Sequence, residues 1–426
     1  MSSLFCFESF NWNEQTGLLS LFYSCQGYCF EERIAFPDAP FCLTQERQKA
    51  LDQVFFLLHI AAGVSYYKAF GNPAIQIRSG VLTKDQAAFF NDFYYFGLGQ
   101  FAAENHLKLK FDFPFGSDRE KMFDLPLGSG AFVPVGGGKD SCVTITRLKR
   151  AQIPTTLFSV NTARPIEDCK RISNLPEVTI WRTISPVLLE NNDHFLNGHV
   201  PISGIIAFIS AAACILYDKR FVVMSCEGSA DEANFKDVNH QWSKSSAFEL
   251  AFGALMAKIL PSFRYFSLLR SMSEMQIAAS FAKNCADYFD VFTSCNHAFH
   301  IDKSKRLLRW CGKCDKCRFV FLILAPFMPK EKLIEIIGQN PLDDPAQEQG
   351  YLALLGLGKS KPFECVGTYD ECRLAFLMLS KRENWQSDYL IQKLSPLLKD
   401  YSIETLEKKV WATGRTDLIP KEFLNV

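Results

Sequence analysis

Residues 131–141 read Ala-Phe-Val-Pro-Val-Gly-Gly-Gly-Lys-Asp-Ser, an apolar run that ends in three glycines and a short polar segment. The apolar half predicts a buried strand, and the polar half predicts the turn into a helix. Glycines let backbone N–H groups approach an anion closely, and a helix N-terminus adds partial positive charge. The stretch is therefore typical of a phosphate-binding loop in an α/β protein.

This loop differs from two common nucleotide-binding motifs. A Walker A loop requires Ser or Thr after its lysine, whereas Asp140 follows Lys139 here. A dinucleotide fingerprint requires Gly-x-Gly-x-x-Gly with an acidic residue downstream, and this stretch lacks that spacing. The sequence therefore indicates a phosphate loop of another kind.

Strand and helix patterns alternate from this loop onward. Short β-branched and aromatic runs predict strands over 131–135, 155–160, 178–183, 221–225, 265–269 and 290–294. The stretches between them predict helices over 142–150, 167–174, 202–217, 246–260 and 274–283. This alternation predicts the α/β class with a doubly wound parallel sheet, whose ligands bind outside the carboxyl ends of the strands.

The segment before the glycine loop has a different pattern of predicted strands and helices. Aromatic runs broken by turn residues predict a β-meander over 4–36. Two helices are expected over 44–60 and 83–101, and a loop over 111–130 separates them from the alternating segment. We therefore expect an N-terminal α+β domain over 1–128.

After residue 330 the pattern is mainly helical, with a loop over 356–368. The expected organisation is a phosphate-binding α/β domain over 129–330, followed by a helical region over 331–426. The loop in this last region has the composition of a shaped segment, so we expect the region to fold back over the binding site as a lid.

The composition indicates where the protein acts and which partners are excluded. The 426 residues carry 46 Lys+Arg and 46 Asp+Glu, so no net field draws the chain to nucleic acid or membranes. The longest nearly apolar stretch, 202–217, is shorter than the ~20 residues that span a bilayer. No signal segment is recognisable, and 15 cysteines fit a reducing compartment. We expect a cytoplasmic protein that binds neither membranes nor nucleic acid.

Several cysteines gather late in the chain. Cys311, Cys314 and Cys317 have a spacing that can wrap one tetrahedral metal ion, and Cys295 is the best fourth ligand. We expect structural zinc; an empty thiol cluster and an iron–sulfur cluster are the alternatives. The basic run 303–318 also leaves an RNA-binding surface open. The alternates for the fourth ligand are His297 and His300.

Three polar loops are expected near the phosphate loop, over 197–201, 226–234 and 239–245. They contain residue types that serve as acids, bases or hydrogen-bond partners, and clustering beside a phosphate loop favours a functional site. The candidates for acid–base chemistry are Cys226, Glu227, His240 and Lys244.

The string 136–141 resembles the Ser-Gly-Gly-x-Asp-Ser loop of the PP-loop ATP pyrophosphatases, with Gly136 in place of the first serine. Those enzymes split ATP between its α and β phosphates and activate a substrate as its adenylate. The resemblance implies a PP-loop (HUP-like) core that binds ATP, with Asp140 near Mg²⁺. It assigns nucleotide contacts to Gly136, Gly137, Gly138, Lys139, Asp140, Ser141, Asn161 and Thr162.

Further strings narrow the family. The segments 65–69, 136–141, 197–204, 227–234, 239–245 and 361–368 together resemble the ATP-dependent UDP-N-acetylmuramoyl-L-alanyl-L-glutamate epimerases of peptidoglycan synthesis. The resemblance implies conversion of the terminal L-Glu of UDP-MurNAc-L-Ala-L-Glu to D-Glu, with ATP becoming AMP and pyrophosphate and with Mg²⁺ required. The expected substrate contacts are His199, Ser229, Asp231, Asn239, Glu364 and Cys365.

The base that would remove the glutamate α proton stays open at this point. Besides the acid–base candidates above, a thiol pair is possible, in which Cys226 works with Cys295 or Cys365. Two other functions also stay open. One is a different PP-loop adenylating enzyme, similar to 7-cyano-7-deazaguanine synthase or to tRNA-modifying enzymes, and the other is a non-catalytic nucleotide-binding or RNA-binding protein.

Overall fold

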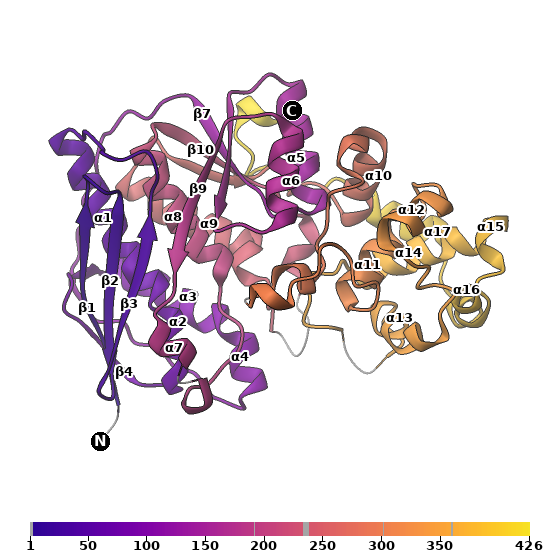
Figure 1. Cartoon of the computed structure of the whole chain (residues 1–426), viewed down its shortest axis with the longest axis horizontal. Helices are drawn as coiled ribbons and strands as arrows, with labels where there is room; N and C mark the ends of the chain where they lie inside the picture. Colours follow the sequence, from indigo (N-terminus) through magenta and orange to yellow (C-terminus); the bar gives the residue numbers. More distant parts are fainter. Residues whose placement is uncertain (1–2, 191, 233–237, 301, 359–360) are drawn as a thin grey trace.

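The computed structural model describes residues 3–190, 192–232, 238–300, 302–358 and 361–426 (Figure 1). These residues form a nine-stranded mixed sheet in the order β11-β10-β7-β8-β9-β3-β2-β1-β4. Its strands are β1 (Leu4–Asn13), β2 (Leu18–Cys25), β3 (Tyr28–Ala35), β4 (Ala74–Ile77), β7 (Gly130–Pro134), β8 (Thr155–Val160), β9 (Glu177–Thr183), β10 (Lys219–Met224) and β11 (Arg264–Ser267). A separate short pair consists of β5 (Leu82–Thr83) and β6 (Phe115–Ser117).

Strands β7 to β11 pair in parallel throughout, which confirms the α/β class and the parallel sheet. The predicted meander is also present, as the antiparallel strands β1 to β3. Strand β3 then pairs antiparallel with β9, so that Arg33 lies opposite Thr183. One continuous sheet therefore crosses the division expected at residue 128.

Helices cover both faces of the parallel strands. Alternate residues of these strands point to opposite faces. Phe132 and Val222 belong to an apolar cluster with one group of helices, whereas their neighbours Val133 and Val223 belong to a second cluster with another group. The first group comprises α1 (Gln45–Ala62), α3 (Lys84–Gly97), α8 (Ile202–Leu216) and α9 (Ser246–Ile259). The second comprises α5 (Lys139–Arg150), α6 (Arg164–Ser173), α10 (Glu274–Asn284) and α11 (Asp315–Leu324).

Three short helices pack into the first apolar cluster. A capping box between Thr83 and Gln86 starts α3 where the sequence predicts a helix start. In the part of the chain that the structure describes, no helix combines the length and the apolar character needed to cross a bilayer. The short helices are α2 (Val64–Tyr67), α4 (Gly99–Glu104) and α7 (Pro186–Glu190).

The C-terminal region is helical, as predicted, and lies at the opposite end of the molecule from the meander (Figure 1). It packs into the second apolar cluster, and its last residues return to the sheet, where the Phe423 ring lies 5.0 Å from Phe221 and 4.8 Å from Phe266. Its remaining helices are α12 (Lys330–Ile337), α13 (Glu348–Leu354), α14 (Tyr369–Ser380), α15 (Glu383–Gln386), α16 (Tyr389–Leu394) and α17 (Ile403–Val410).

The strand predicted over 290–294 is wrong, because these residues form turns and irregular backbone. The Phe292 ring packs against Phe281 and Trp310 instead of extending a ladder. The Thr293 N–H donates to the Gly137 carbonyl at 2.9 Å, so this segment supports the glycine loop. An apolar run of this length indicates burial but does not distinguish a strand from a buried loop.

Candidate functional site

A cavity of about 410 Å³ lies where the carboxyl ends of β7, β8 and β10 meet. Its lining combines the glycine loop and the residues after β10 with two segments far along the chain, 294–299 and 364–365. The volume is within the range of small-molecule sites. Nine of the expected site residues line this cavity: Gly136, Gly138, Asp140, Ser141, Cys226, Glu227, Lys244, Glu364 and Cys365.

The glycine loop is built to approach a ligand closely. Gly137 has a φ of +78°, and a Cβ there would lie 2.9 Å from Pro165. Gly138 is the N-cap of α5, and among the described residues no side chain caps this helix end. The first N–H groups of α5 are therefore available to an anion.

The side chain of Lys139 turns away from the cavity. It is 1% exposed, and its ammonium contacts the carboxylates of both Asp140 and Glu274. The structure thus brings Asp140 to the cavity, whereas Lys139 is not among the residues that line it.

Burial and charge act in opposite directions on the pKa values of these carboxyl groups. Burial opposes the charge of Asp140, yet the ammonium groups of Lys139 and Lys316 hold its pKa below the ordinary value. Burial dominates at Glu274 and raises its pKa to about 8, although Lys139 opposes this. Asp140 therefore keeps its negative charge at the cavity, as a ligand of a divalent cation should.

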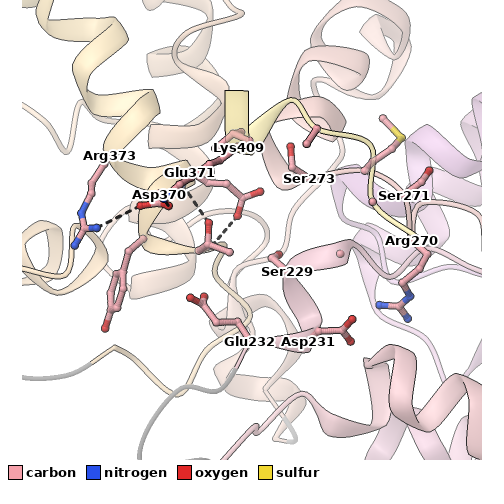
Figure 2. Close-up of a pocket in the computed structure, with 17 residues that line it drawn as sticks. Ser229, Asp231, Glu232, Arg270, Ser271, Ser273, Asp370, Glu371, Arg373 and Lys409 are labelled. Carbon is pink, nitrogen blue, oxygen red and sulfur yellow. Dashed lines mark hydrogen bonds and ion pairs between the residues drawn. The ribbon is translucent and has the colours of Figure 1, made fainter. Parts of the chain in front are cut away.

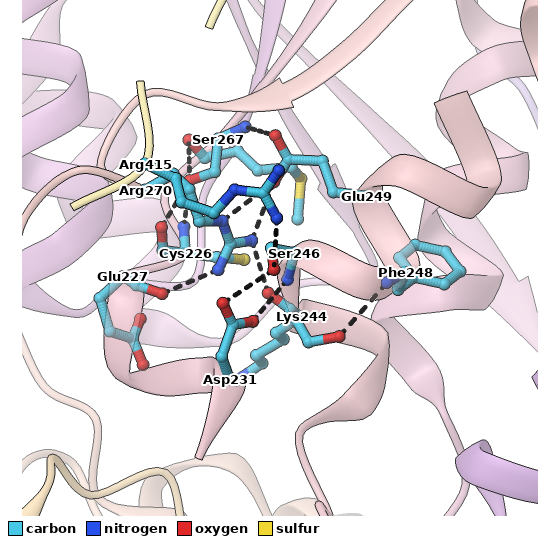
Figure 3. A network of polar contacts seen from close by, with 12 residues as sticks. Cys226, Glu227, Asp231, Lys244, Ser246, Phe248, Glu249, Ser267, Arg270 and Arg415 are labelled. Carbon is cyan, nitrogen blue, oxygen red and sulfur yellow. Dashed lines mark hydrogen bonds and ion pairs between the residues drawn. The ribbon is translucent and has the colours of Figure 1, made fainter. Parts of the chain in front are cut away.

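The residues after β10 are held by a buried network (Figure 3). Arg270 is 2% exposed and donates to Glu249 Oε2 at 2.9 Å, to the Glu227 carbonyl at 2.8 Å and to the Lys244 carbonyl at 2.7 Å. The Ser267 hydroxyl accepts from the Cys226 N–H at 2.7 Å and donates to the Cys226 carbonyl at 2.6 Å. Cys226, Glu227 and Lys244 are thus fixed in place through their backbone.

The sequence interpretation missed Arg270, Glu249 and Ser267. The available signal was a charge inside an apolar stretch: Glu249 interrupts the apolar helix α9, and Arg270 directly follows Leu268-Leu269. Buried charges occur in pairs, so each predicts the existence of the other. The interpretation also missed the cavity residues Ser203, Ser225, Asn296, Phe299 and Lys316.

Lys244, Cys365 and His240 form a cluster at the edge of the cavity. The Lys244 ammonium donates to Cys365 Sγ at 3.1 Å, and His240 Nε2 lies 3.9 Å from the same sulfur. The nearby Cys365 sulfur is the main cause that raises the pKa of Lys244 above its ordinary value, and burial acts against it. Burial, together with nearby cations, lowers the pKa of His240 to about 3.

Other expected residues lie outside this cavity. Asn161 has a φ of +60° and uses its side chain to bind the backbone of Arg182. Thr162 lines a different cavity, beside Lys170, so the strand β8 contributes Ser159 and Val160 instead. His199 lies near His240, with 6.1 Å between the rings, and Asn239 donates to the Ala230 carbonyl. Ala233 and Asn234 of the expected loop lie outside the described residues.

Ser229 and Asp231 line a second cavity of about 660 Å³ (Figure 2). It lies between the segments 228–232 and 270–273 and the helices α14 and α17. Both carboxylate oxygens of Asp231 accept hydrogen bonds from Ser246, which gives this residue a structural role. The Ser229 hydroxyl is buried without a hydrogen-bond partner among the described residues.

The four expected cysteine ligands converge. The Sγ atoms of Cys295, Cys311, Cys314 and Cys317 lie within 4.8 Å of one another, whereas His297 and His300 are not part of the group. The separations include 3.9 Å for Cys295 to Cys314, 3.6 Å for Cys311 to Cys317 and 3.4 Å for Cys314 to Cys317. A tetrahedron with Zn–S bonds of ~2.3 Å separates its sulfurs by about 3.8 Å, so the donor set fits zinc.

Comparison with known proteins gives matches over most of the chain. Residues 1–268 match the family model of the MurL N-terminal domain, and residues 291–409 match that of the MurL C-terminal domain. A protein of Xanthomonas oryzae pv. oryzae, named UDP-N-acetyl-alpha-D-muramoyl-L-alanyl-L-glutamate epimerase, is 41% identical over 89% of this chain and 86% of its own length. A protein of Salinispora tropica with the same name is 37% identical over 97% of this chain and 91% of its own length.

Proposed function

The chain belongs to the MurL epimerase family, and on that premise we propose that it inverts the terminal glutamate of UDP-MurNAc-L-Ala-L-Glu through an acyl-adenylate made from ATP. The product is the D-Glu form of a peptidoglycan precursor. The observation that carries the ATP-dependent part is the uncapped start of α5, with the glycine loop, facing a cavity shared with Asp140 and Cys365.

The loop supports pyrophosphate binding in a PP-loop core. Its backbone N–H groups and the N-terminus of α5 would hold the β and γ phosphates, and Ser141 lines the same cavity. Asp140 would hold Mg²⁺, which supplies charge neutralisation when the reacting phosphates approach the carboxylate. The residues after β10 line the same cavity and would lie close to the reacting groups.

Activation of the glutamate α-carboxylate explains why ATP is consumed in a reaction that only inverts one stereocentre. A free carboxylate disfavours loss of the neighbouring proton, because the carbanion would form beside a negative charge. Adenylation removes that charge, so that a positioned base can take the proton. Return of a proton to the opposite face inverts the centre, and water then releases AMP and the D-Glu product.

The lysines near the cavity suit this chemistry. Lys244 and Lys316 both line it, and Lys316 also contacts the Cys365 carbonyl. Both ammonium groups would balance the negative charge of the nucleotide and of the developing enolate. Buried cations in a site of this kind act more strongly than they would in water.

We further propose that Cys295, Cys311, Cys314 and Cys317 hold a structural zinc ion. A closed shell of four thiolates leaves no position for a reactive water, so the ion would serve folding. It would fix the segment 294–299, whose Ser294, Asn296 and Phe299 line the nucleotide cavity.

The test is incubation of the protein with ATP, Mg²⁺ and UDP-MurNAc-L-Ala-L-Glu, followed by chiral analysis of the glutamate and separation of the nucleotides. We expect D-Glu together with AMP and pyrophosphate. The absence of D-Glu in a protein that binds ATP would contradict the epimerase proposal. Formation of ADP and phosphate with inversion intact would contradict only the adenylate route.

A further inference from the structure

Cys365 occupies an unusual position for a cysteine. It lies in the loop that precedes α14, yet it lines the cavity of the glycine loop, more than two hundred residues earlier in the chain. Two basic side chains approach its sulfur, the Lys244 ammonium at 3.1 Å and His240 Nε2 at 3.9 Å. A half-exposed thiol between a cation and an imidazole is the setting of a reactive thiolate.

Lys244 is held so that its charge stays on Cys365. Its carbonyl accepts from Arg270 at 2.7 Å, and Arg270 is itself fixed by Glu249. The pKa of Lys244 is raised above its ordinary value, first by the Cys365 sulfur and against the effect of burial. The ammonium is therefore permanent at neutral pH, and an adjacent cation favours the thiolate form of a cysteine.

His240 supplies a neutral partner. Burial, and then His199, Lys244, Lys316 and Lys361, lower the pKa of His240 to about 3, so the imidazole is uncharged at neutral pH. An uncharged ring nitrogen can accept a proton from a thiol and pass it on. The ring therefore offers a route by which Cys365 loses a captured proton.

Cys226, a second thiol, lines the same cavity as Cys365. Burial raises the pKa of its thiol to about 12, although Arg270 and Lys244 act against this. Its backbone is fixed on both sides by the Ser267 hydroxyl. One cavity thus holds a sulfur that contacts a buried ammonium and another sulfur that keeps its proton, and this arrangement offers a base and an acid to one substrate.

We infer that Cys365 removes the α proton of the substrate glutamate and that Cys226 returns a proton to the other face. In the first step the Cα–H bond breaks, an S–H bond forms on Cys365, and the electron pair stays on the adenylated glutamate as an enolate. In the second step the Cys226 S–H bond breaks and a new Cα–H bond forms. Exchange with solvent then restores both sulfurs. This assignment rests on the proposed function.

The test compares Cys365→Ser and Cys226→Ser with the wild type in D₂O, with Cys42→Ser as the matched control because Cys42 is exposed and distant in sequence from the site. Starting from the L-Glu substrate, we expect Cys365→Ser to lose deuterium uptake at Cα by about 10²–10⁴-fold, the usual contribution of a general base. Cys226→Ser should take up deuterium while the glutamate stays L. Starting from the D-Glu compound, the two variants should exchange these behaviours.

Pyrophosphate exchange into ATP, which needs adenylation but no inversion, shows whether each variant still folds and activates its substrate. Both serine variants should retain it. Wild-type deuterium uptake from L-Glu in Cys365→Ser would overturn the inference while leaving the proposed function intact. If both serine variants lost the pyrophosphate exchange and also lost deuterium uptake, this would overturn the inference as well, because the cysteines would then act in folding or activation. Lack of inversion in the wild type itself would instead refute the proposed function.

Discussion

At the scale of single residues, the three glycines of the phosphate loop differ in what they require. Gly137 has a positive φ and no room for a Cβ beside Pro165, whereas no described atom lies within 4 Å of a Cβ at Gly136. We expect Gly137→Ala to lower the free energy of unfolding by at least about 1–2 kcal/mol, the cost of a left-handed backbone. Gly136→Ser should change it by less than about 0.5 kcal/mol.

Urea denaturation of the two variants measures this contrast, and calorimetric titration with ATP reports the loop itself. The Gly136→Ser variant, which restores the serine of the PP-loop pattern, should bind ATP at least as well as the wild type. Equal stability of Gly137→Ala and wild type would show that the loop relaxes around the added methyl group.

Substitutions at Lys139 and at Asp140 should have different effects, the first on stability and the second on activity. Lys139→Met leaves the buried Glu274 carboxyl group without its cation, and removal of one partner from a buried pair costs about 3–5 kcal/mol. Asp140→Asn keeps the pair of Lys139 and Glu274, so the fold should remain while AMP formation is lost. Chemical denaturation and a nucleotide assay check both; full AMP formation by Asp140→Asn would move the site elsewhere.

The sequence predicted which residues meet at the cavity better than it predicted which way they point. Lys139 belongs to the glycine motif, but α5 begins at Lys139 and places its side chain against Glu274 rather than toward the cavity. Arg270 and Glu249 escaped notice because their pairing joins a strand end to a helix, a relation that no local pattern contains. Side-chain direction depends on helix phase and on tertiary partners.

At the scale of elements, the four cysteines tie two separate segments together. We expect one zinc ion per chain, and Cys314→Ser should lose it and lower the midpoint of thermal unfolding, because a structural zinc contributes directly to folding. His300→Ala is the control, since His300 is not part of the group of four sulfurs. Metal analysis by mass spectrometry and a thermal melt check this; a fully stable, metal-free wild-type protein would refute it.

The order of strands and helices could be predicted because periodicity and turn residues are local signals. The strand β8 (Thr155–Val160) agrees with its prediction residue for residue. The segment 290–294 was mistaken for a strand because burial gives the same apolar run in a strand and in a packed loop. Pairing of β9 with β3 could not be predicted, because it joins residues about 150 positions apart, and the buried ion pair of Arg182 with Glu32 that joins the two strands has no local signal in the sequence.

At the scale of the whole molecule, two buried histidines link stability to pH. Burial lowers the pKa of His59 to about 4 and that of His240 to about 3, against about 6.5 in an unfolded chain. The unfolded state therefore binds protons that the folded state does not, so their contribution is complete above pH 6.5 and is lost as the pH falls toward 4. At pH 5 each histidine should lower the free energy of unfolding by about 2 kcal/mol relative to its value above pH 6.5.

His59→Gln tests this linkage, because glutamine keeps a donor and an acceptor for the Ser79 hydroxyl and the Phe22 carbonyl but does not titrate. We expect the free energy of unfolding, measured by urea denaturation between pH 6.5 and 5, to fall less steeply with pH for this variant than for the wild type. The difference in slope should correspond to one proton taken up on unfolding. An unchanged slope would mean that His59 keeps its ordinary pKa in the folded protein.

The most direct test of the whole account follows the oxygen atoms of the glutamate α-carboxylate. The substrate carries oxygen-18 in that group, and mass spectrometry of the AMP follows turnover with ATP and Mg²⁺. If the carboxylate attacks the α phosphate and water later attacks the carbonyl carbon, AMP carries one oxygen-18 atom for each glutamate released. Unlabelled AMP alongside inverted glutamate would contradict this account, in which an acyl-adenylate forms and water cleaves it at the carbonyl carbon.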